Sequence, residues 1–260
     1  SVSHALEYYI ADFALSRFAE ALGKKKDAEM FYKRSLGYKH YYSKEFGTFR
    51  PILPDGTFYS PFNPRQGENF EPNPGFHEGS AWNYSFYVPH DVYGLAKLMG
   101  GKNPFIKKLQ MVFDEGLYDP ANEPDIAYAH LFSYFRGEEW RTQKETQRLL
   151  DKYFTTKPNG IPGNDDTGTM SAWAIFNMIG FYPDCPGLPE YTLTTPVFNK
   201  VTIRLDPKWY KEKELVIESN RTQPGTLYIN KVLLNGKKFN QYRITHDELV
   251  HSQRILFDLK

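Results

Sequence analysis

Residues 160–173 read GIPGNDDTGTMSAW and lead from a loop into an apolar helix. Three glycines and a proline predict a tight, irregular loop. Asn164, Asp165 and Asp166 are consecutive within it, and the helix is expected from Met170 to Ile179. Adjacent carboxylates repel each other, and this cost is expected only where the pair has a role. A hard cation, a proton relay and an N-cap are the alternatives, and capping alone needs only one Asp.

The segments on the N-terminal side of this loop have helical periodicity. Residues 4–22 and 27–42 predict a helix pair, and residues 46–75 predict a long loop with a short hairpin around Asp55-Gly56. No second copy of the helix pair recurs at a fixed period, so a repeat array is not expected. Further helices are predicted at residues 91–99, 104–115, 122–135 and 140–154.

After Pro183 the pattern changes to short strands. Asn235-Gly236 is a strong signal for a hairpin turn. We therefore predict an α+β fold with a boundary near residue 185: a helical part at 1–185 and an antiparallel β region, resembling a β-sandwich, at 186–260. The expected strands are residues 191–193, 200–205, 214–218, 228–234 and 255–258.

Composition excludes several classes of function. The 260 residues suffice for one large or two modest domains, and the net charge of +1 without a basic stripe indicates neither nucleic acid nor an anionic membrane as partner. No apolar run is long enough for a membrane-spanning helix. Cys185 is the single cysteine, so no disulfide within the chain is expected. The chain begins at Ser1 without a signal peptide, which we interpret as a mature chain or a piece of a longer one.

Three predicted junctions between loop and helix carry acids: Glu78, Glu123 with Asp125, and Asp165 with Asp166. In a toroid of helix hairpins such junctions meet at one end. Two carboxylates across a sugar pocket can hydrolyse a glycosidic bond, because one protonates the leaving oxygen while the other activates a water. In inverting enzymes the two carboxyl groups are roughly 6.5–9.5 Å apart.

The same loops offer oxygen ligands for a metal ion. Asn122, Glu123, Asn164 and Asp165 would suit Ca²⁺, which prefers carboxylate and amide oxygens. The sequence contains no His or Cys cluster for zinc, no glycine-rich phosphate loop and no nucleophile elbow.

Each of these residues also has a plain structural interpretation. Glu78 could be a solvated acid, and Glu123 could simply favour a helix N-terminus. Trp82 and Tyr84 could be core aromatics instead of sugar platforms, and His90 could be an ordinary loop or core histidine. The chain contains 19 Tyr, 20 Phe and 4 Trp, so much of its aromatic content is expected to pack between helices.

Several ordered blocks together resemble the glycoside hydrolase family 92 α-mannosidases. The resemblance extends over nearly the whole chain. The blocks are EGSAWNY at 78–84, VPHD at 88–91, NEP at 122–124, GNDDTGTMSAW at 163–173, GFYP at 180–183, CPG at 185–187, TPVF at 195–198 and NRT at 220–222.

The resemblance implies a Ca²⁺-dependent, inverting exo-α-mannosidase, commonly α-1,2-acting, from bacteria that degrade N-glycans or yeast mannan. It implies a periplasmic, secreted or cell-surface location. The family fold joins an N-terminal β-sandwich to an (α/α)₆ barrel, and this chain resembles the C-terminal half of the barrel and the closing strands. A half-barrel would expose apolar helix faces, so we expect the missing N-terminal half, or self-association, to cover them.

The resemblance also implies roles for individual residues. Glu78 matches the general acid and Asp166 the general base, with Asp165 or Asn164 beside it, and the order of these side chains leaves open which acid is the base. Glu123 matches a mannose or Ca²⁺ contact. The expected pocket-lining residues are Trp82, Tyr84, His90 and Asp91. The alternative, from another class, is a non-catalytic helical and β module for binding or scaffolding, in which the acids only cap helices and solvate loops.

Overall fold

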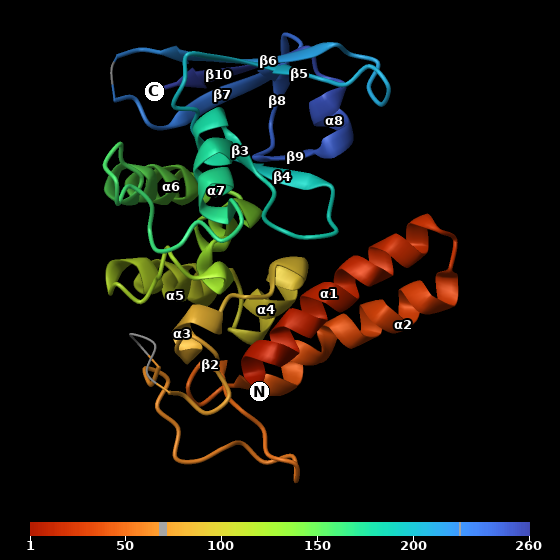
Figure 1. Ribbon diagram of the computed structural model, residues 1–260, viewed down its shortest axis with the longest axis vertical. Coiled ribbons are helices and arrows are strands. Elements are labelled where there is room, and N and C mark those ends of the chain that lie inside the picture. The colour runs from red at the N-terminus through yellow and green to blue at the C-terminus, as the bar shows by residue number, and fades with distance from the viewer. Residues whose placement is uncertain (68–71, 224) are drawn as a thin grey trace. The chain divides into compact units, whose positions relative to one another are not determined.

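The computed structural model describes residues 1–67, 72–223 and 225–260, which form two compact units. Unit 1 contains Ser1–Tyr128 and Cys185–Leu188, and unit 2 contains Ala129–Asp184 and Pro189–Lys260. Figure 1 shows the elements of both units, which are described separately below. Residues 68–71 of the predicted long loop lie outside the described residues.

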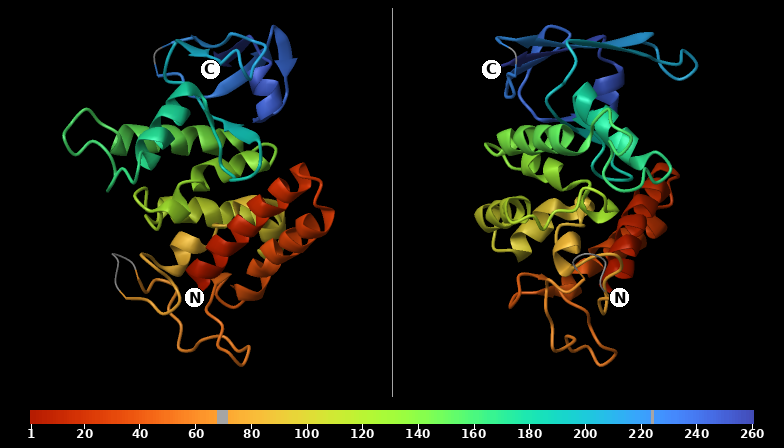
Figure 2. Two further views of the ribbon diagram at one scale, coloured as in Figure 1. Left: turned by 45° about the vertical axis from the view of Figure 1, so that its right-hand side comes forward. Right: turned by 60° about the vertical axis from the view of Figure 1, so that its left-hand side comes forward.

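Unit 1 begins with the predicted helix pair. Helix α1 spans Val2–Ala21, and its N-cap is Ser1, whose hydroxyl accepts a hydrogen bond from the His4 backbone N–H. Helix α2 spans Lys25–Ser35 and continues as the 3₁₀ helix η1, Leu36–Tyr41. The two helices pack along each other, as both views in Figure 2 show. The first predicted helix is confirmed, and the second changes its hydrogen-bond pattern after Ser35.

The long loop of unit 1 contains little regular structure. Strands β1, Tyr42–Ser43, and β2, Thr48–Phe49, form a short antiparallel pair. The predicted hairpin around Asp55-Gly56 is present only as one antiparallel bridge between Ile52 and Phe58. Gly56 has a φ of 84°, a conformation that glycine adopts without a steric penalty.

The rest of unit 1 consists of short helices. Asp91 starts α4 as predicted, because its Oδ1 accepts a 3.0 Å hydrogen bond from the Gly94 N–H. The α-helix predicted at 122–135 is wrong: two 3₁₀ helices replace it, and the buried Asp125 side chain turns back to bond the Asp119 N–H. The elements are α3 Ala81–Tyr84, η3 Pro89–Asp91, α4 Val92–Leu98, α5 Lys102–Asp114, η4 Glu123–Asp125 and η5 Tyr128–Tyr134, which ends in unit 2.

The described part of unit 2 combines three α-helices with two sheets. Helices α6, Glu139–Tyr153, and α7, Thr169–Ile179, are where the sequence predicts them. The three-stranded sheet has the order β3-β4-β9, and the five-stranded sheet has the order β5-β6-β10-β7-β8. The strands are β3 Phe181–Tyr182, β4 Glu190–Leu193, β5 Lys200–Arg204, β6 Glu214–Arg221, β7 Ile229–Leu234, β8 Lys237–Phe239, β9 Arg243–Thr245 and β10 Arg254–Leu259, and helix α8 is His246–Val250.

The five-stranded sheet is mixed, because β10 pairs with β6 in parallel and with β7 antiparallel. The prediction of a wholly antiparallel region is therefore wrong at one pair. In the sequence, β9 and α8 lie between β8 and β10. No tight turn therefore joins β10 to β6 or to β7, its two neighbours in the sheet. The turn predicted at Asn235-Gly236 is confirmed, with φ angles of 50° and 81°.

Alternation along the strands places one face of this sheet in a core. Leu215 and Ile217 of β6 and Ile255, Phe257 and Leu259 of β10 are almost fully buried. The residues between them on the other face are the half-buried Val216, Leu256 and Asp258, and on the same face Arg254 forms an ion pair with Glu218.

The α+β class is confirmed. The change from helix to strand falls between α7 and β3, close to the expected position, whereas the contacts group α6 and α7 with the sheets in unit 2. A domain boundary at residue 185 stays a prediction. No helix in the described part of the chain has the length and apolar character needed to cross a membrane.

Candidate active site

Glu78 is presented by a strained turn in unit 1. Its φ is 52°, in the left-handed region that costs a non-glycine residue on the order of 1–3 kcal/mol. The Nδ2 of Asn122 donates a 2.6 Å hydrogen bond to the Glu78 carbonyl, and Ser80 caps α3 two residues later. The Glu78 side chain is 57% exposed, and its Oε1 lies 3.5 Å from Nε2 of His77. The backbone of Glu78 is therefore fixed while its carboxylate faces solvent.

The buried carboxylate of Asp125 supports this turn. Oδ2 of Asp125 accepts hydrogen bonds from Nδ2 of Asn83 at 2.9 Å and from the Asp119 N–H at 2.7 Å. Asn83 also accepts from the N–H and hydroxyl of Ser80, which completes the cap of α3. Complete burial raises the pKa of Asp125 well above its usual range. Asp125 thus connects the turn that carries Glu78 to the turn that carries Glu123.

Tyr84 is subject to the charges of several acids of unit 1. It is almost fully buried, and its hydroxyl donates a 2.7 Å hydrogen bond to the His77 carbonyl. Burial raises the pKa of Tyr84, and nearby carboxylates raise it further. These carboxylates belong to Glu7, Asp125, Glu78 and Glu123. The three predicted acids of unit 1, Glu78, Glu123 and Asp125, therefore all act on the same phenol.

Glu7 joins this group, although no sequence motif marks it. It comes from α1, and its carboxylate is hydrogen bonded to Tyr87. Burial raises the pKa of Glu7, and the charge of Glu123 adds to this effect. Glu123 itself is exposed at the start of η4. Glu7 was missed because an acid on an amphipathic helix has no local signal that separates it from a solvated one.

Three of the predicted pocket-lining residues make structural contacts. His90 places Nε2 2.9 Å from the Ser35 carbonyl, its ring packs on Phe13, and burial lowers its pKa. Asp91 accepts a 2.7 Å hydrogen bond from the Tyr38 hydroxyl in addition to capping α4. Tyr84, as described above, bonds to backbone. Trp82 is half-buried in α3. The assignment of these residues to substrate binding stays a prediction.

The two adjacent acids in unit 2 have different surroundings. Oδ1 of Asp165 accepts a 2.8 Å hydrogen bond from the Ser171 N–H in the first turn of α7. Asp166 is exposed with a φ of 45°, and its carbonyl accepts from the hydroxyl of Thr169. Within the described residues, no hydrogen bond reaches the Asp166 carboxylate. Asp165 therefore holds the loop onto the helix, and Asp166 presents its carboxylate to solvent.

The four predicted calcium ligands come from both units. Asn122 and Glu123 belong to unit 1, and Asn164 and Asp165 belong to unit 2. All four offer side-chain oxygens, and the Nδ2 of Asn122 is the atom bound to Glu78, so this donor set fits the chemistry of a hard cation. Among the described residues, no cluster of three or more His, Cys, Asp or Glu side chains is arranged to hold a metal ion.

Comparison with known proteins defines the class. The family model described as the glycosyl hydrolase family 92 catalytic domain matches residues 1–260. The chain belongs to this family, which confirms the resemblance predicted from the sequence blocks.

Solved structures agree with this assignment. The structure is similar to the family GH92 α-mannosidase BT3965 from Bacteroides thetaiotaomicron, with 31% sequence identity and a TM-score of 0.91. It is also similar to the inverting mannosidase BT2199 from the same species, with 31% identity and a TM-score of 0.88. Both comparisons cover 100% of this chain but only 34% and 37% of those chains.

A curated fungal relative has similar coverage. It is described as an uncharacterized secreted glycosidase of Arthroderma benhamiae and is 26% identical over 265 residues. The match covers 95% of this chain and 34% of the relative. The chain therefore spans about a third of the length of the proteins that it matches.

Proposed function

We propose that the protein containing this chain is an exo-acting, inverting α-mannosidase that removes mannose, α-1,2-linked in the first instance, from glycans. One observation carries the assignment beyond family membership. Among the described residues only four other than glycine have a positive φ, and Glu78 and Asp166 are two of them. Such strain is characteristic of functional sites. A related α-mannosidase has been solved in complex with mannoimidazole, which supports a mannose-type ligand.

In this proposal Glu78 is the general acid and Asp166 the general base. Glu78 donates its proton to the glycosidic oxygen as the bond from that oxygen to the sugar carbon breaks. Asp166 removes a proton from a water whose oxygen attacks the same carbon from the opposite face, so the configuration inverts. Asp165 positions the loop through its bond to Ser171. Asn122 fixes the backbone that carries Glu78.

Calcium belongs to the same proposal. Asn122, Glu123, Asn164 and Asp165 would hold Ca²⁺, and the ion would supply positive charge that orients sugar hydroxyls. Glu123 and Glu7 would contact the sugar from unit 1, and Trp82 would pack beside it.

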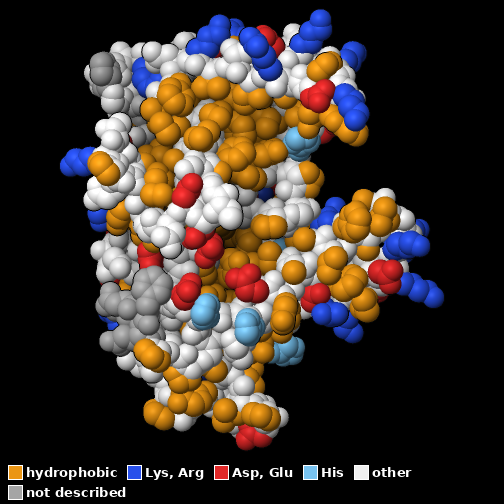
Figure 3. All heavy atoms as spheres, in the orientation of Figure 1, with side chains coloured by type: hydrophobic (Ala, Val, Ile, Leu, Met, Phe, Trp, Pro, Cys, Tyr) orange, Lys and Arg blue, Asp and Glu red, His pale blue; other side chains and the backbone are white. Residues whose placement is uncertain are grey.

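The remaining parts of the prediction concern the rest of the protein. We propose that further sequence, or a second copy, covers the apolar surface of unit 2. Ile175 of α7 and Val197 and Phe198 after β4 are between 39% and 56% exposed. Figure 3 shows a broad patch of hydrophobic side chains in the part of the view where Figure 1 places α7 and the sheets. A secreted, periplasmic or cell-surface location fits the secreted relative.

The stereochemistry of the first product tests the proposal. Full-length protein incubated with calcium and an α-1,2-linked mannobiose should release β-mannose as its first product. NMR spectra recorded before mutarotation identify the anomer that is released. Release of α-mannose would contradict inversion. Absence of hydrolysis of every α-mannoside, with Glu78→Gln indistinguishable from the natural protein, would instead favour the non-catalytic binding module.

A further inference from the structure

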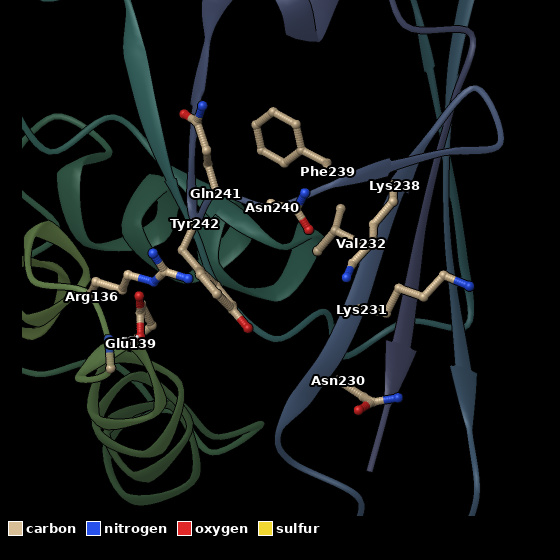
Figure 4. A pocket seen from close by; sticks show the side chains of 11 residues that line it. Arg136, Glu139, Asn230, Lys231, Val232, Lys238, Phe239, Asn240, Gln241 and Tyr242 are labelled. Atoms are coloured by element: carbon tan, nitrogen blue, oxygen red, sulfur yellow. Dashed lines mark hydrogen bonds between the residues drawn. The ribbon is translucent and has the colours of Figure 1, made fainter.

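A hollow of about 590 Å³ lies within unit 2, beneath the edge strand β8 (Figure 4). Its walls come from the turn before α6, from β7 and β8, and from the segment 240–242 that leads into β9. The volume lies within the range of roughly 300–1,000 Å³ that is typical of small-ligand sites. None of the residues assigned above to catalysis or calcium lines it.

The lining combines an aromatic face with side-chain amides. Figure 4 shows the Tyr242 ring on one side of the hollow and Val232 and Lys238 on the other, with Asn240 between them. Tyr242 is half-buried, and its hydroxyl lies 3.4 Å from the Ile229 carbonyl, so the ring is held in place. Gln241 adds a second exposed amide. A sugar ring presents an apolar C–H face for the aromatic ring and hydroxyls that both donate to and accept from amides.

The charged groups around the hollow have both signs, with three cationic side chains and one anionic side chain among the lining residues. Glu139 lies close enough to Tyr242 that its charge raises the pKa of the phenol, although burial is the larger cause. A negative charge at this position opposes an anionic ligand beside the ring. Arg136, Lys231 and Lys238, which also line the hollow, oppose a cationic ligand. A neutral polyhydroxylated molecule avoids both penalties.

A second hollow extends the first. It has a volume of about 420 Å³ and shares Glu139 and Tyr242 with the first hollow. Trp140 and Tyr228 add two more aromatic rings to its lining. Trp140 is 40% exposed, and the guanidinium of Arg141 lies 4.5 Å from the centroid of its ring and so fixes its orientation. Two adjoining hollows, each with an aromatic ring, suit at least two consecutive sugar units.

We propose that these two hollows form one groove that binds a neutral oligosaccharide and retains polymeric substrate on the protein. The groove is defined by Trp140, Tyr228, Phe239 and Tyr242 with the amides of Asn240 and Gln241. The choice of a mannose-containing glycan as its ligand rests on the proposed function. The groove itself follows from the shape and chemistry of unit 2.

Binding and hydrolysis by the full-length protein test the proposal. Trp140→Ala and Gln241→Ala remove exposed groups, and Trp209→Ala is the matched control, because Trp209 is 73% exposed in unit 2 and lies outside the groove. We expect Trp140→Ala to weaken binding to soluble yeast mannan about tenfold, as loss of an aromatic anchor typically does. Gln241→Ala should weaken it about threefold, and Trp209→Ala should have no effect. The rate on a small aryl α-mannoside should be unchanged in all three.

The outcomes separate this inference from the proposed function. Equal mannan affinity for Trp140→Ala and Trp209→Ala would overturn the groove. A lower unfolding temperature of Trp140→Ala with unchanged mannan affinity would also overturn it, because Trp140 would then have a structural role only. Binding that depends on Trp140 in a protein that hydrolyses no α-mannoside would support the groove while the catalytic proposal fails.

Discussion

The side-chain amide of Asn122 donates a 2.6 Å hydrogen bond to the backbone carbonyl of Glu78, across 44 residues of sequence. This bond joins the turn before α3 to the start of η4. Because Glu78 has a left-handed backbone, its turn needs such external support to keep one conformation. The orientation of the proposed general acid therefore depends on a residue that has no part in proton transfer.

Replacement of this donor should impair catalysis without unfolding the protein. Asn122→Asp keeps the shape and an oxygen for a cation, but it places a carboxylate oxygen opposite the Glu78 carbonyl. Loss of a buried hydrogen bond costs about 1–3 kcal/mol, so we expect kcat/KM to fall by about tenfold or more. Steady-state kinetics at saturating calcium, with circular dichroism as a control of folding, measure this. An unchanged kcat/KM would show that the bond does not position Glu78.

The two adjacent aspartates should differ in their contribution to stability. Asp165→Ala removes the bond to the Ser171 N–H, so the free energy of unfolding should fall by about 1 kcal/mol, as for other caps. Asp166→Asn removes the charge of an exposed carboxylate at a φ of 45°, a conformation that asparagine tolerates, and should leave stability nearly unchanged while the rate falls by about 10²-fold or more. Denaturant unfolding and kinetics on the same variants measure both effects. The reverse pattern would make Asp165 the base.

Asp165→Asn is the matched control for this pair. Asparagine also caps helices, so this variant should keep the stability that Asp165→Ala loses. Glu29→Gln, at an exposed position on α2, should change neither stability nor rate.

Periodicity in the sequence predicted the long helices and most strands because burial of one face dictates where apolar residues recur. It failed at 122–135, where the tertiary hydrogen bond from Asp119 to Asp125 replaces α-helical geometry with 3₁₀ turns. It also failed at the parallel pair of β6 and β10, because local sequence does not determine which distant strands pair. Strands β3, β8 and β9 and helix α8 were missed because each is only two to five residues long.

For the site too, local signals in the sequence mark some residues, whereas the roles of others depend on contacts that the sequence does not show. The acids at 78, 123, 165 and 166 could be selected because loop signals and a family resemblance mark them. The different surroundings of Asp165 and Asp166 could not be predicted, because a cap depends on the orientation of one carboxylate towards one N–H. Glu7 could not be predicted either, because its partner Tyr87 is 80 positions away in the printed numbering.

Asp12 should make stability depend on pH. Burial raises its pKa, although Arg34, 3.2 Å away, opposes the shift. A carboxyl whose pKa is raised by folding contributes stability below its unfolded pKa of 3.8, and this contribution is lost as pH rises through the folded pKa. The Asp12→Asn variant cannot ionise at this position and does not lose this contribution. The difference in free energy of unfolding, variant minus natural protein, should therefore increase between pH 4 and pH 7. Urea unfolding at several pH values measures this difference, and a gap that stays constant with pH would contradict it.

Arg243 should be the most sensitive ionic residue of unit 2. Its Nη1 lies 2.9 Å from Oδ2 of Asp184, whose side chain is fully buried, and its Nη2 lies 3.0 Å from Glu190. The guanidinium also packs 3.9 Å from the centroid of the Tyr134 ring. The charge of Asp184 raises the pKa of Arg243 despite burial, which by itself lowers it.

Arg243→Ala leaves the Asp184 carboxylate buried without its cation, so we expect a loss of about 3–5 kcal/mol in the free energy of unfolding. Arg254→Ala is the control, because Arg254 pairs with Glu218 on the exposed face of the sheet and such pairs contribute only about 0–1 kcal/mol. The double variant Arg243→Met with Asp184→Asn should recover part of the loss, since it removes both charges. Thermal and denaturant unfolding of the three variants measure these differences. Similar losses for Arg243→Ala and Arg254→Ala would show that burial of Asp184 carries no special electrostatic cost.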